Sequence, residues 1–232
     1  MNTAAKRLVS ATGTWKNPFI PEFKDQRKFQ GLQVHSAHYV NETPFRNKKV
    51  LIVGGGNSGA QILAEVSKVA QTTWVTLQEP KFLPDNVDGR YLFEFATRQY
   101  KARLEGKKIE PVGSLGDVVM VGTVKEARER QVLKAVRPFD AFFEEGVIWQ
   151  NNNKEAFGAV IWCTGFKSSL DHLKGLNIME NGRTQTNGTH SKKVDGLWLV
   201  GYGNWTGYAS ATLIGVGRTA RSTVKEIQDF LN

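Results

Sequence analysis

A glycine-rich turn between a short apolar run and an amphipathic segment is the clearest chemical motif in the sequence. In "KKVLIVGGGNSGAQILAEVSKVAQTTWVTLQEP", residues 48–80, Gly54, Gly56 and Gly59 match the pattern G-x-G-x-x-G. The apolar run 50–53 predicts a buried strand, and the residues after the glycines have helical spacing. Glycines at such a junction let a pyrophosphate approach the backbone N–H groups at the helix N-terminus. The motif predicts a dinucleotide-binding turn; the alternative is a tight strand-to-helix turn without a ligand.

The end of the next predicted strand, 72–77, bears on which dinucleotide would bind. The sequence continues T-L-Q-E from residue 76, with no arginine at this strand end. Glu79 could accept a hydrogen bond from a ribose hydroxyl, although a solvated surface carboxylate is an equal alternative. A 2′-phosphate would be left to Gln78, which brings no charge, or to Lys81 and Arg90, which could partly restore attraction but do not stand at the strand end. We therefore expect weak discrimination between the coenzymes, with NADH accepted at least comparably to NADPH.

Composition excludes several other chemistries. The 232 residues include one cysteine, Cys163, which rules out an internal disulfide or a CxxC redox pair. The four histidines are scattered, so we expect no structural metal site. The net charge of +9 comes from scattered basic pairs rather than a cluster, so we expect no nucleic-acid partner. No apolar run approaches the roughly 18 residues of a membrane span, and the first residues lack a signal-peptide core. We expect a cytoplasmic protein without a membrane partner.

The elements that would position these residues are those of an α/β protein. A short strand within 6–13 precedes a proline-rich stretch that cannot be helical, because prolines stand at 18 and 21. Helical periodicity extends over 91–106 and over 123–136, and a terminal helix is predicted from about Ala209 to Leu231. Residues 146–163 predict a β-hairpin with a polar tip at 151–154 that returns as the buried strand 159–163, and "GLWLVGYG" predicts one more strand.

Several motifs occur together in a characteristic order. These are "SATG" at 10–13, "FQGLQVHSAHY" at 29–39, the glycine motif, "VIWCTGF" at 160–166, and "GLWLVGYGNW" at 196–205. Over essentially the whole chain, the sequence resembles the flavin-containing monooxygenase and Baeyer–Villiger monooxygenase group of flavoproteins. It looks closest to small bacterial NAD(P)H-dependent members, in which "GGGNSGAQILAEVS" and "ASATLIGV" also occur.

The resemblance implies a Rossmann-like, three-layer NAD(P)H-binding domain inserted into the remainder of a second, FAD-binding Rossmann-like domain. The implied division is 1–45 for a residual FAD-domain segment and linker, 46–164 for the NAD(P)H domain, and 165–232 for the carboxyl-terminal part of the FAD domain. In this group an FAD fingerprint precedes the inserted domain. The chain contains only the second fingerprint, so the resemblance also implies that an amino-terminal FAD-binding segment of about one Rossmann half is missing.

The resemblance further implies an activity and a set of cofactor-binding residues. NAD(P)H would reduce FAD, and a peroxide adduct of the reduced flavin would oxygenate a sulfide, amine or ketone, so the flavin carries the reaction and no catalytic side chain is identified. Many NADPH-dependent relatives carry arginine where Leu77 stands, and many such flavoproteins carry aspartate where Asn204 stands. The implied cofactor-binding residues are Gly54, Gly56, Asn57, Ser58, Gly59, Leu77, Gln78, His35, Thr164, Gly165, Gly201, Asn204, Ala211 and Thr212.

Other interpretations remain open at this point. The chain could be a nucleotide-binding module without turnover, either a fragment or one piece of a split flavoprotein, whose partner is the missing segment or a second copy in a homodimer. A disulfide reductase of the same architecture is excluded because it needs a second cysteine. Cys163 lies in an apolar strand and is expected to be a packed rather than a reactive thiol. His35, expected on a linker, would help couple the two domains or else be a surface histidine.

Overall fold

The computed structural model describes residues 5–87, 89–107 and 116–231. The chain forms two compact units, each built from separate stretches of sequence. One unit comprises residues 18–92 and 110–165, and the other comprises residues 1–17, 93–109 and 166–232. We call them the sheet unit and the terminal unit. No helix among the described residues is both long enough and apolar enough to cross a membrane.

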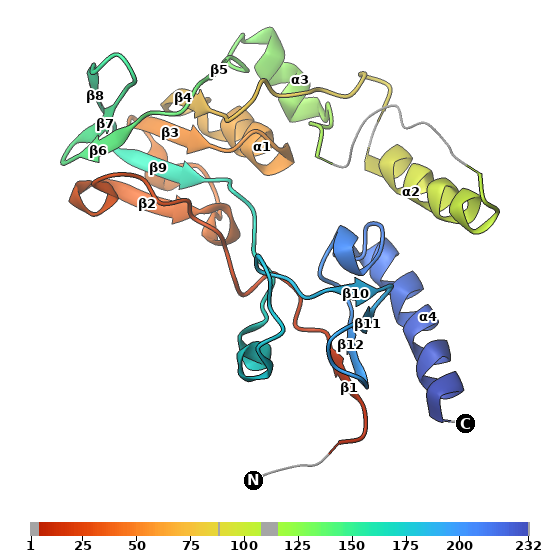
Figure 1. The fold of residues 1–232 in the computed structure, drawn as a ribbon. Helices are drawn as coiled ribbons and strands as arrows, with labels where there is room; N and C mark the ends of the chain where they lie inside the picture. Colours follow the sequence, from red (N-terminus) through yellow and green to blue (C-terminus); the bar gives the residue numbers. More distant parts are fainter. Residues whose placement is uncertain (1–4, 88, 108–115, 232) are drawn as a thin grey trace. The chain divides into compact units, whose positions relative to one another are not determined.

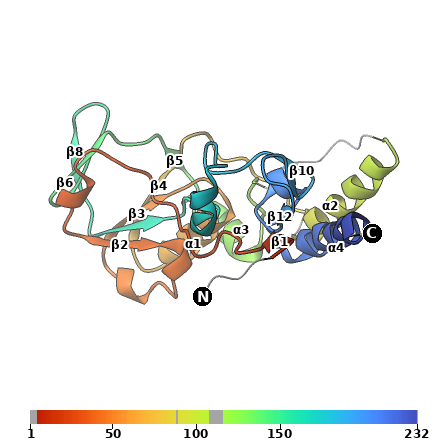
Figure 2. The same ribbon diagram turned by 60° about the horizontal axis from the view of Figure 1, so that its bottom comes forward.

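The sheet unit is built on a five-stranded parallel sheet with the order β2-β9-β3-β4-β5 (Figure 1). Figure 2 shows β2, β3 and β4 of this sheet from a second direction. Helices α1 and α3 follow β3 and precede β5, respectively. The bounds are β2 Leu32–His35, β3 Lys49–Val53, α1 Asn57–Val66, β4 Gln71–Val75, α3 Gly122–Glu129, β5 Ala135–Val136 and β9 Ala159–Trp162.

Both faces of this sheet are covered, which explains why β3 is apolar at consecutive positions. Val50 and Ile52 pack in one cluster with Leu63 of α1 and Val124 of α3. The alternate residues of β3 pack in a second cluster with Phe142 and Val147 of an antiparallel three-stranded sheet, β6-β7-β8. The layers are therefore helices, parallel sheet and antiparallel sheet, as the three-layer prediction requires. The added strands are β6 Ala141–Phe143, β7 Gly146–Ile148 and β8 Lys154–Ala156.

The terminal unit contains a four-stranded sheet with the order β1-β12-β11-β10. Strand β1 pairs in parallel with β12, and the other pairs are antiparallel. The long helix α4 packs on this sheet through Phe230, which contacts Trp198 edge to face at 5.9 Å between ring centroids. The bounds are β1 Leu8–Ser10, β10 Thr186–Asn187, β11 His190–Ser191, β12 Leu197–Leu199 and α4 Leu213–Leu231; helix α2, Gly89–Leu104, lies in this unit from residue 93 onward.

Short 3₁₀ helices complete the described secondary structure. They span Gln26–Lys28, Ser36–His38, Thr43–Phe45, Asp171–Leu176 and Asn204–Thr206.

The α/β class predicted from the sequence is confirmed, with three local corrections. The helix predicted over 123–136 ends at Glu129, because Gln131 adopts a left-handed conformation at φ 57°, and 135–136 form β5. The hairpin with its tip at 151–154 exists, but β7 pairs with β8, while β9 belongs to the parallel sheet. The terminal helix begins at Leu213 rather than Ala209, because Ala209 has a φ of 57° and so cannot belong to a right-handed helix. Residues 18–45, which the sequence division places outside the nucleotide-binding domain, belong to the sheet unit.

Candidate nucleotide-binding site

The turn between β3 and α1 is fixed by close backbone contacts at its glycines. Gly54 has a φ of 131°, and a Cβ there would lie 2.1 Å from the carbonyl oxygen of Cys163. A Cβ on Gly59 would lie 2.1 Å from the carbonyl oxygen of Gly54, which also accepts a 2.8 Å hydrogen bond from Trp74 Nε1. These two glycines are needed for helix, turn and strand to pack closely.

Gly56 has a different role because its surroundings are open. It is the N-cap residue of α1, and a Cβ there would meet no atom within 4 Å. The first N–H groups of a helix have no partner within the helix, and they carry the positive end of the helix dipole. The turn thus presents hydrogen-bond donors beside an open space at Gly56, with Ser58 exposed in the first turn. This geometry suits a pyrophosphate.

A cavity of about 670 Å³ lies at the carboxyl ends of the central parallel strands. It belongs entirely to the sheet unit. Strand order reverses beside β3, since β4 lies on one side and β9 on the other, and ligands of open α/β sheets bind at such positions. Its lining includes Val53, Gly54, Gly55, Thr76, Leu77, Gln78, Glu79, Lys81, Asp117, Cys163 and Thr164.

Asn57, a predicted cofactor-binding residue, holds the cavity wall through its side chain. Its Nδ2 donates to the carbonyl oxygen of Asp117 at 2.9 Å, and its Oδ1 accepts from the backbone N–H of Val119 at 2.8 Å. The amide therefore ties the first turn of α1 to the segment 117–119. Its side-chain role in this structure is to position that wall.

The end of β4 has no arginine, as the sequence shows, but an arginine from the neighbouring strand lies beside it. Arg137 follows β5, the parallel neighbour of β4, and its Nη2 lies 2.8 Å from Glu79 Oε2. Leu77 is 85% exposed and Gln78 is exposed, and both line the cavity with Glu79 and Lys81. The sequence pattern predicted a helix over 123–136, so Arg137 was not expected at the sheet edge. A strand predicted at 135–136 would have placed residue 137 beside the end of β4. The described residues that line the cavity do not include Arg90.

His35 ends strand β2 and is 4% exposed, so it is neither on a flexible linker nor at the surface. Its Nδ1 accepts from the N–H of Ala37 at 3.1 Å, and its Nε2 lies 3.0 Å from the carbonyl oxygen of Gly165. Burial lowers the pKa of His35 below its ordinary value of 6.5. The carbonyl oxygen of Gly165 also accepts a hydrogen bond from the N–H of Phe19. Thr164 Oγ1 donates to the carbonyl oxygen of Phe19. His35, Thr164 and Gly165 thus fix the segment that closes one side of the cavity.

Cys163 is buried beside the same segment, and burial raises the pKa of its thiol to about 12. The thiol is therefore neutral near pH 7, which confirms the prediction of a packed cysteine. Among the residues that the structure describes, no cluster of His, Cys, Asp and Glu side chains has the arrangement of a metal site.

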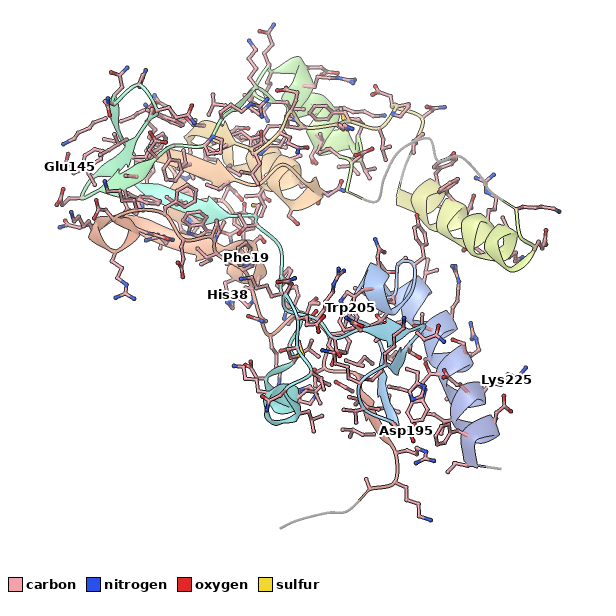
Figure 3. The ribbon with its side chains drawn as sticks, viewed as in Figure 1. Phe19, His38, Glu145, Asp195, Trp205 and Lys225 are labelled. Carbon is pink, nitrogen blue, oxygen red and sulfur yellow. The ribbon has the colours of Figure 1, made fainter. Side chains whose placement is uncertain are left out.

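The remaining predicted residues lie in the terminal unit, around the N-terminus of α4. Figure 3 labels Trp205, which ends the predicted stretch 201–205. Thr212 caps α4, because its hydroxyl accepts from Gly215 N–H at 3.1 Å and donates to the Ala209 carbonyl oxygen at 2.7 Å. Asn204 is exposed, and its Oδ1 accepts from Ala209 N–H at 3.2 Å. Ala211 is also exposed, and a Cβ on Gly203 would meet nothing within 4 Å.

These residues fit the two cofactors that the sequence implies, NAD(P)H in the sheet unit and FAD in the terminal unit. The open space at Gly56 and the cavity lined by Gly54 and Gly55 suit the pyrophosphate and ribose of NAD(P)H. The turn at 201–204, with Gly201 at φ 87° and the exposed side chain of Asn204, offers an amide to a flavin, and the 19-residue helix α4 offers its N-terminus.

Comparison with known proteins gives consistent relatives. The family model described as pyridine nucleotide-disulphide oxidoreductase matches residues 2–201. A flavin-containing monooxygenase from Stenotrophomonas maltophilia is 46% identical, with a TM-score of 0.84, over 97% of this chain and 63% of that one. An uncharacterized CzcO-like oxidoreductase from Geobacillus kaustophilus is 25% identical over 97% of this chain and 66% of that protein. An indole-3-pyruvate monooxygenase, YUCCA4, from Oryza sativa subsp. japonica is 27% identical over 97% of this chain and 57% of that protein. The chain thus spans somewhat less than two thirds of these relatives.

Proposed function

Because the chain belongs to the pyridine nucleotide-disulphide oxidoreductase family, we propose that it acts in a flavoprotein monooxygenase that uses NAD(P)H and FAD to oxygenate a small molecule. The relationship to flavin-containing monooxygenases expected from the sequence is confirmed by the 46% identical relative. The disulphide chemistry in the family description needs two thiols, and the sequence has one cysteine.

The observation that carries this proposal is the turn from Gly54 to Gly56, which lines the cavity through Gly54 and Gly55 and has open space at Gly56. In this proposal, the sheet unit binds NAD(P)H. Gly54 and Gly59 shape the turn, and the first N–H groups of α1, including those of Asn57 and Ser58, hold the pyrophosphate. Leu77, Gln78 and Glu79 border the adenosine ribose. Residues 165–232 contribute to FAD binding through Gly201, Asn204, Ala211 and Thr212.

Bound FAD would supply the redox chemistry and the reaction with dioxygen, and NAD(P)H would supply the electrons. The chain's own residues bind and orient these groups. Thr164, Gly165 and His35 hold the cavity wall in place. As substrate we propose a sulfide, an amine or a ketone, the classes that the sequence resemblance implies.

The proposal is tested by replacing Gly56 with alanine. The added methyl group meets no protein atom within 4 Å, so the fold should be kept, but it occupies the space given to the pyrophosphate. We expect the affinity for NADH, measured by calorimetry, to fall at least about tenfold, which corresponds to roughly 1.4 kcal/mol.

A matched control is Gly122→Ala, at the first residue of α3, where a Cβ also meets nothing within 4 Å. It should bind NADH as the wild type does. Equal affinity in wild type and Gly56→Ala, or no binding by the wild type, would contradict the proposal. Binding without FAD-dependent NADH oxidation would favour the alternative of a nucleotide-binding module without turnover.

A further inference from the structure

Glu79 and Arg137 form an ion pair at the edge of the cavity. Their atoms Oε2 and Nη2 are 2.8 Å apart, and the side chains are 74% and 47% exposed. The pair follows from strand register: Val75 pairs with Val136, so Thr76 to Glu79 and Arg137 leave the sheet side by side. The N–H of Thr76 donates to the Val136 carbonyl oxygen at 3.0 Å, which extends this alignment past the strand ends.

Two groups with opposite preferences for the coenzyme therefore meet at one place. In dinucleotide-binding sheets, the adenosine ribose lies at the end of the second strand, where an acid accepts from the 2′-hydroxyl or an arginine binds the 2′-phosphate. Glu79 suits the first role, and the forked guanidinium of Arg137 suits the second. An exposed ion pair contributes little to stability, so it can be broken when a phosphate binds.

We infer that Arg137 is the residue of this chain that binds a 2′-phosphate, and that Glu79 restrains it and repels the same phosphate. The inference rests on the proposed function, since it places an adenosine ribose in this cavity. Leu77 has no donor and Gln78 has no charge, so neither can replace the guanidinium. Lys81 also lines the cavity, but as a single ammonium it lacks the forked geometry.

The pair makes the coenzyme preference depend on both residues together. With both present, attraction by Arg137 and repulsion by Glu79 oppose each other, so wild type should discriminate weakly. Removing the carboxylate should favour 2′-phosphorylated ligands, and removing the guanidinium should disfavour them. Without Arg137, removing Glu79 should raise the affinity for 2′-phosphorylated ligands much less, because no guanidinium is freed and only the repulsion by the carboxylate is lost.

Calorimetric titration with ADP-ribose and with 2′-phospho-ADP-ribose tests the inference without turnover, because these ligands differ only in the 2′-phosphate. We expect Glu79→Gln to bind the 2′-phosphorylated ligand about tenfold more tightly than wild type, and Arg137→Gln to bind it about tenfold more weakly. Affinity for ADP-ribose should change less than about threefold in both variants. The double variant should bind the 2′-phosphorylated ligand more weakly than wild type, and its gain over Arg137→Gln should be much smaller than the gain of Glu79→Gln over wild type.

Asp85→Asn is the matched control. Asp85 pairs with Arg128 at 2.6 Å in the same unit, and its replacement changes the net charge as Glu79→Gln does, but Asp85 does not line the cavity. It should leave the ratio of the two affinities unchanged.

The outcomes distinguish a failure of the role given to Arg137 from a failure of the proposed nucleotide binding. If ADP-ribose binds but Arg137→Gln leaves the ratio of affinities unchanged, or if Asp85→Asn raises it as much as Glu79→Gln does, the inference is overturned and nucleotide binding stands. If wild type does not bind ADP-ribose, the proposed function fails and the inference fails with it.

Discussion

The protonation state of His35 follows from its two hydrogen bonds. Because Nδ1 accepts from Ala37 N–H, the neutral ring carries its hydrogen on Nε2, which donates to the Gly165 carbonyl oxygen. Burial holds the pKa of His35 below 6.5, so the folded chain keeps this ring neutral under conditions that would charge an exposed histidine. His35 is thus a structural residue at the cavity wall.

The lowered pKa predicts how His35 affects stability as pH changes. Above about 6.5 the ring is neutral in both folded and unfolded chains. As pH falls below that value, the unfolded chain binds a proton that the folded chain resists, so the free energy of unfolding decreases. We expect urea denaturation of His35→Gln between pH 5 and pH 8 to show a smaller decrease than wild type. Gln keeps a donor but cannot titrate.

His38→Gln is the control for this prediction. His38 is exposed in the following 3₁₀ helix, and its position is labelled in Figure 3. It is a lesser cause of the lowered pKa of His35, so this variant should retain most of the wild-type pH dependence. A wild-type profile in His35→Gln would show that other groups set the acid sensitivity.

At the scale of elements, the sequence predicts best those elements that depend on residues close together in the chain. The strand, glycine turn and helix at 49–66 depend on neighbouring residues, so the sequence predicted them and the turn geometry agrees. Strands β2 and β5 gain their structure from distant partners, β9 and β4, and have four and two residues. Neither gives a clear periodic signal, and for the same reason Arg137 was not placed beside Glu79.

The attachment of α1 to the segment 117–119 is another contact between distant elements, and it depends on Asn57. We expect Asn57→Ala to lower the free energy of unfolding by about 1–3 kcal/mol, because it leaves a part-buried N–H and a carbonyl without their side-chain partner. Urea denaturation measures this loss. Ser58→Ala, at the exposed neighbouring position, should change stability by less than about 0.5 kcal/mol. Equal stability of Asn57→Ala and wild type would show that water replaces both bonds.

At the scale of the whole molecule, every residue that lines the candidate nucleotide cavity lies in the sheet unit. We expect ADP-ribose to slow amide hydrogen exchange in β3, α1, β4 and residues 116–119. Exchange through unfolding of this unit should slow by up to about a hundredfold at a ligand concentration of 100 Kd. Mass spectrometry with and without ligand would measure the change, and Gly56→Ala should show less protection than wild type at the same ligand concentration. Protection confined to α4 and β12 would place the nucleotide in the terminal unit instead.

The pairing of β1 with β12 also has a consequence for synthesis on the ribosome. Leu8 pairs with Leu197, so the first strand emerges long before its partner has been translated. At about 5–20 residues per second, the wait is roughly 10–40 s. Strand β2 is likewise synthesised well before its partner β9, since Leu32 pairs with Ala159. During that interval both strands expose unpaired backbone groups, which are the usual starting points for aggregation, so the nascent chain should be a substrate for ribosome-associated chaperones.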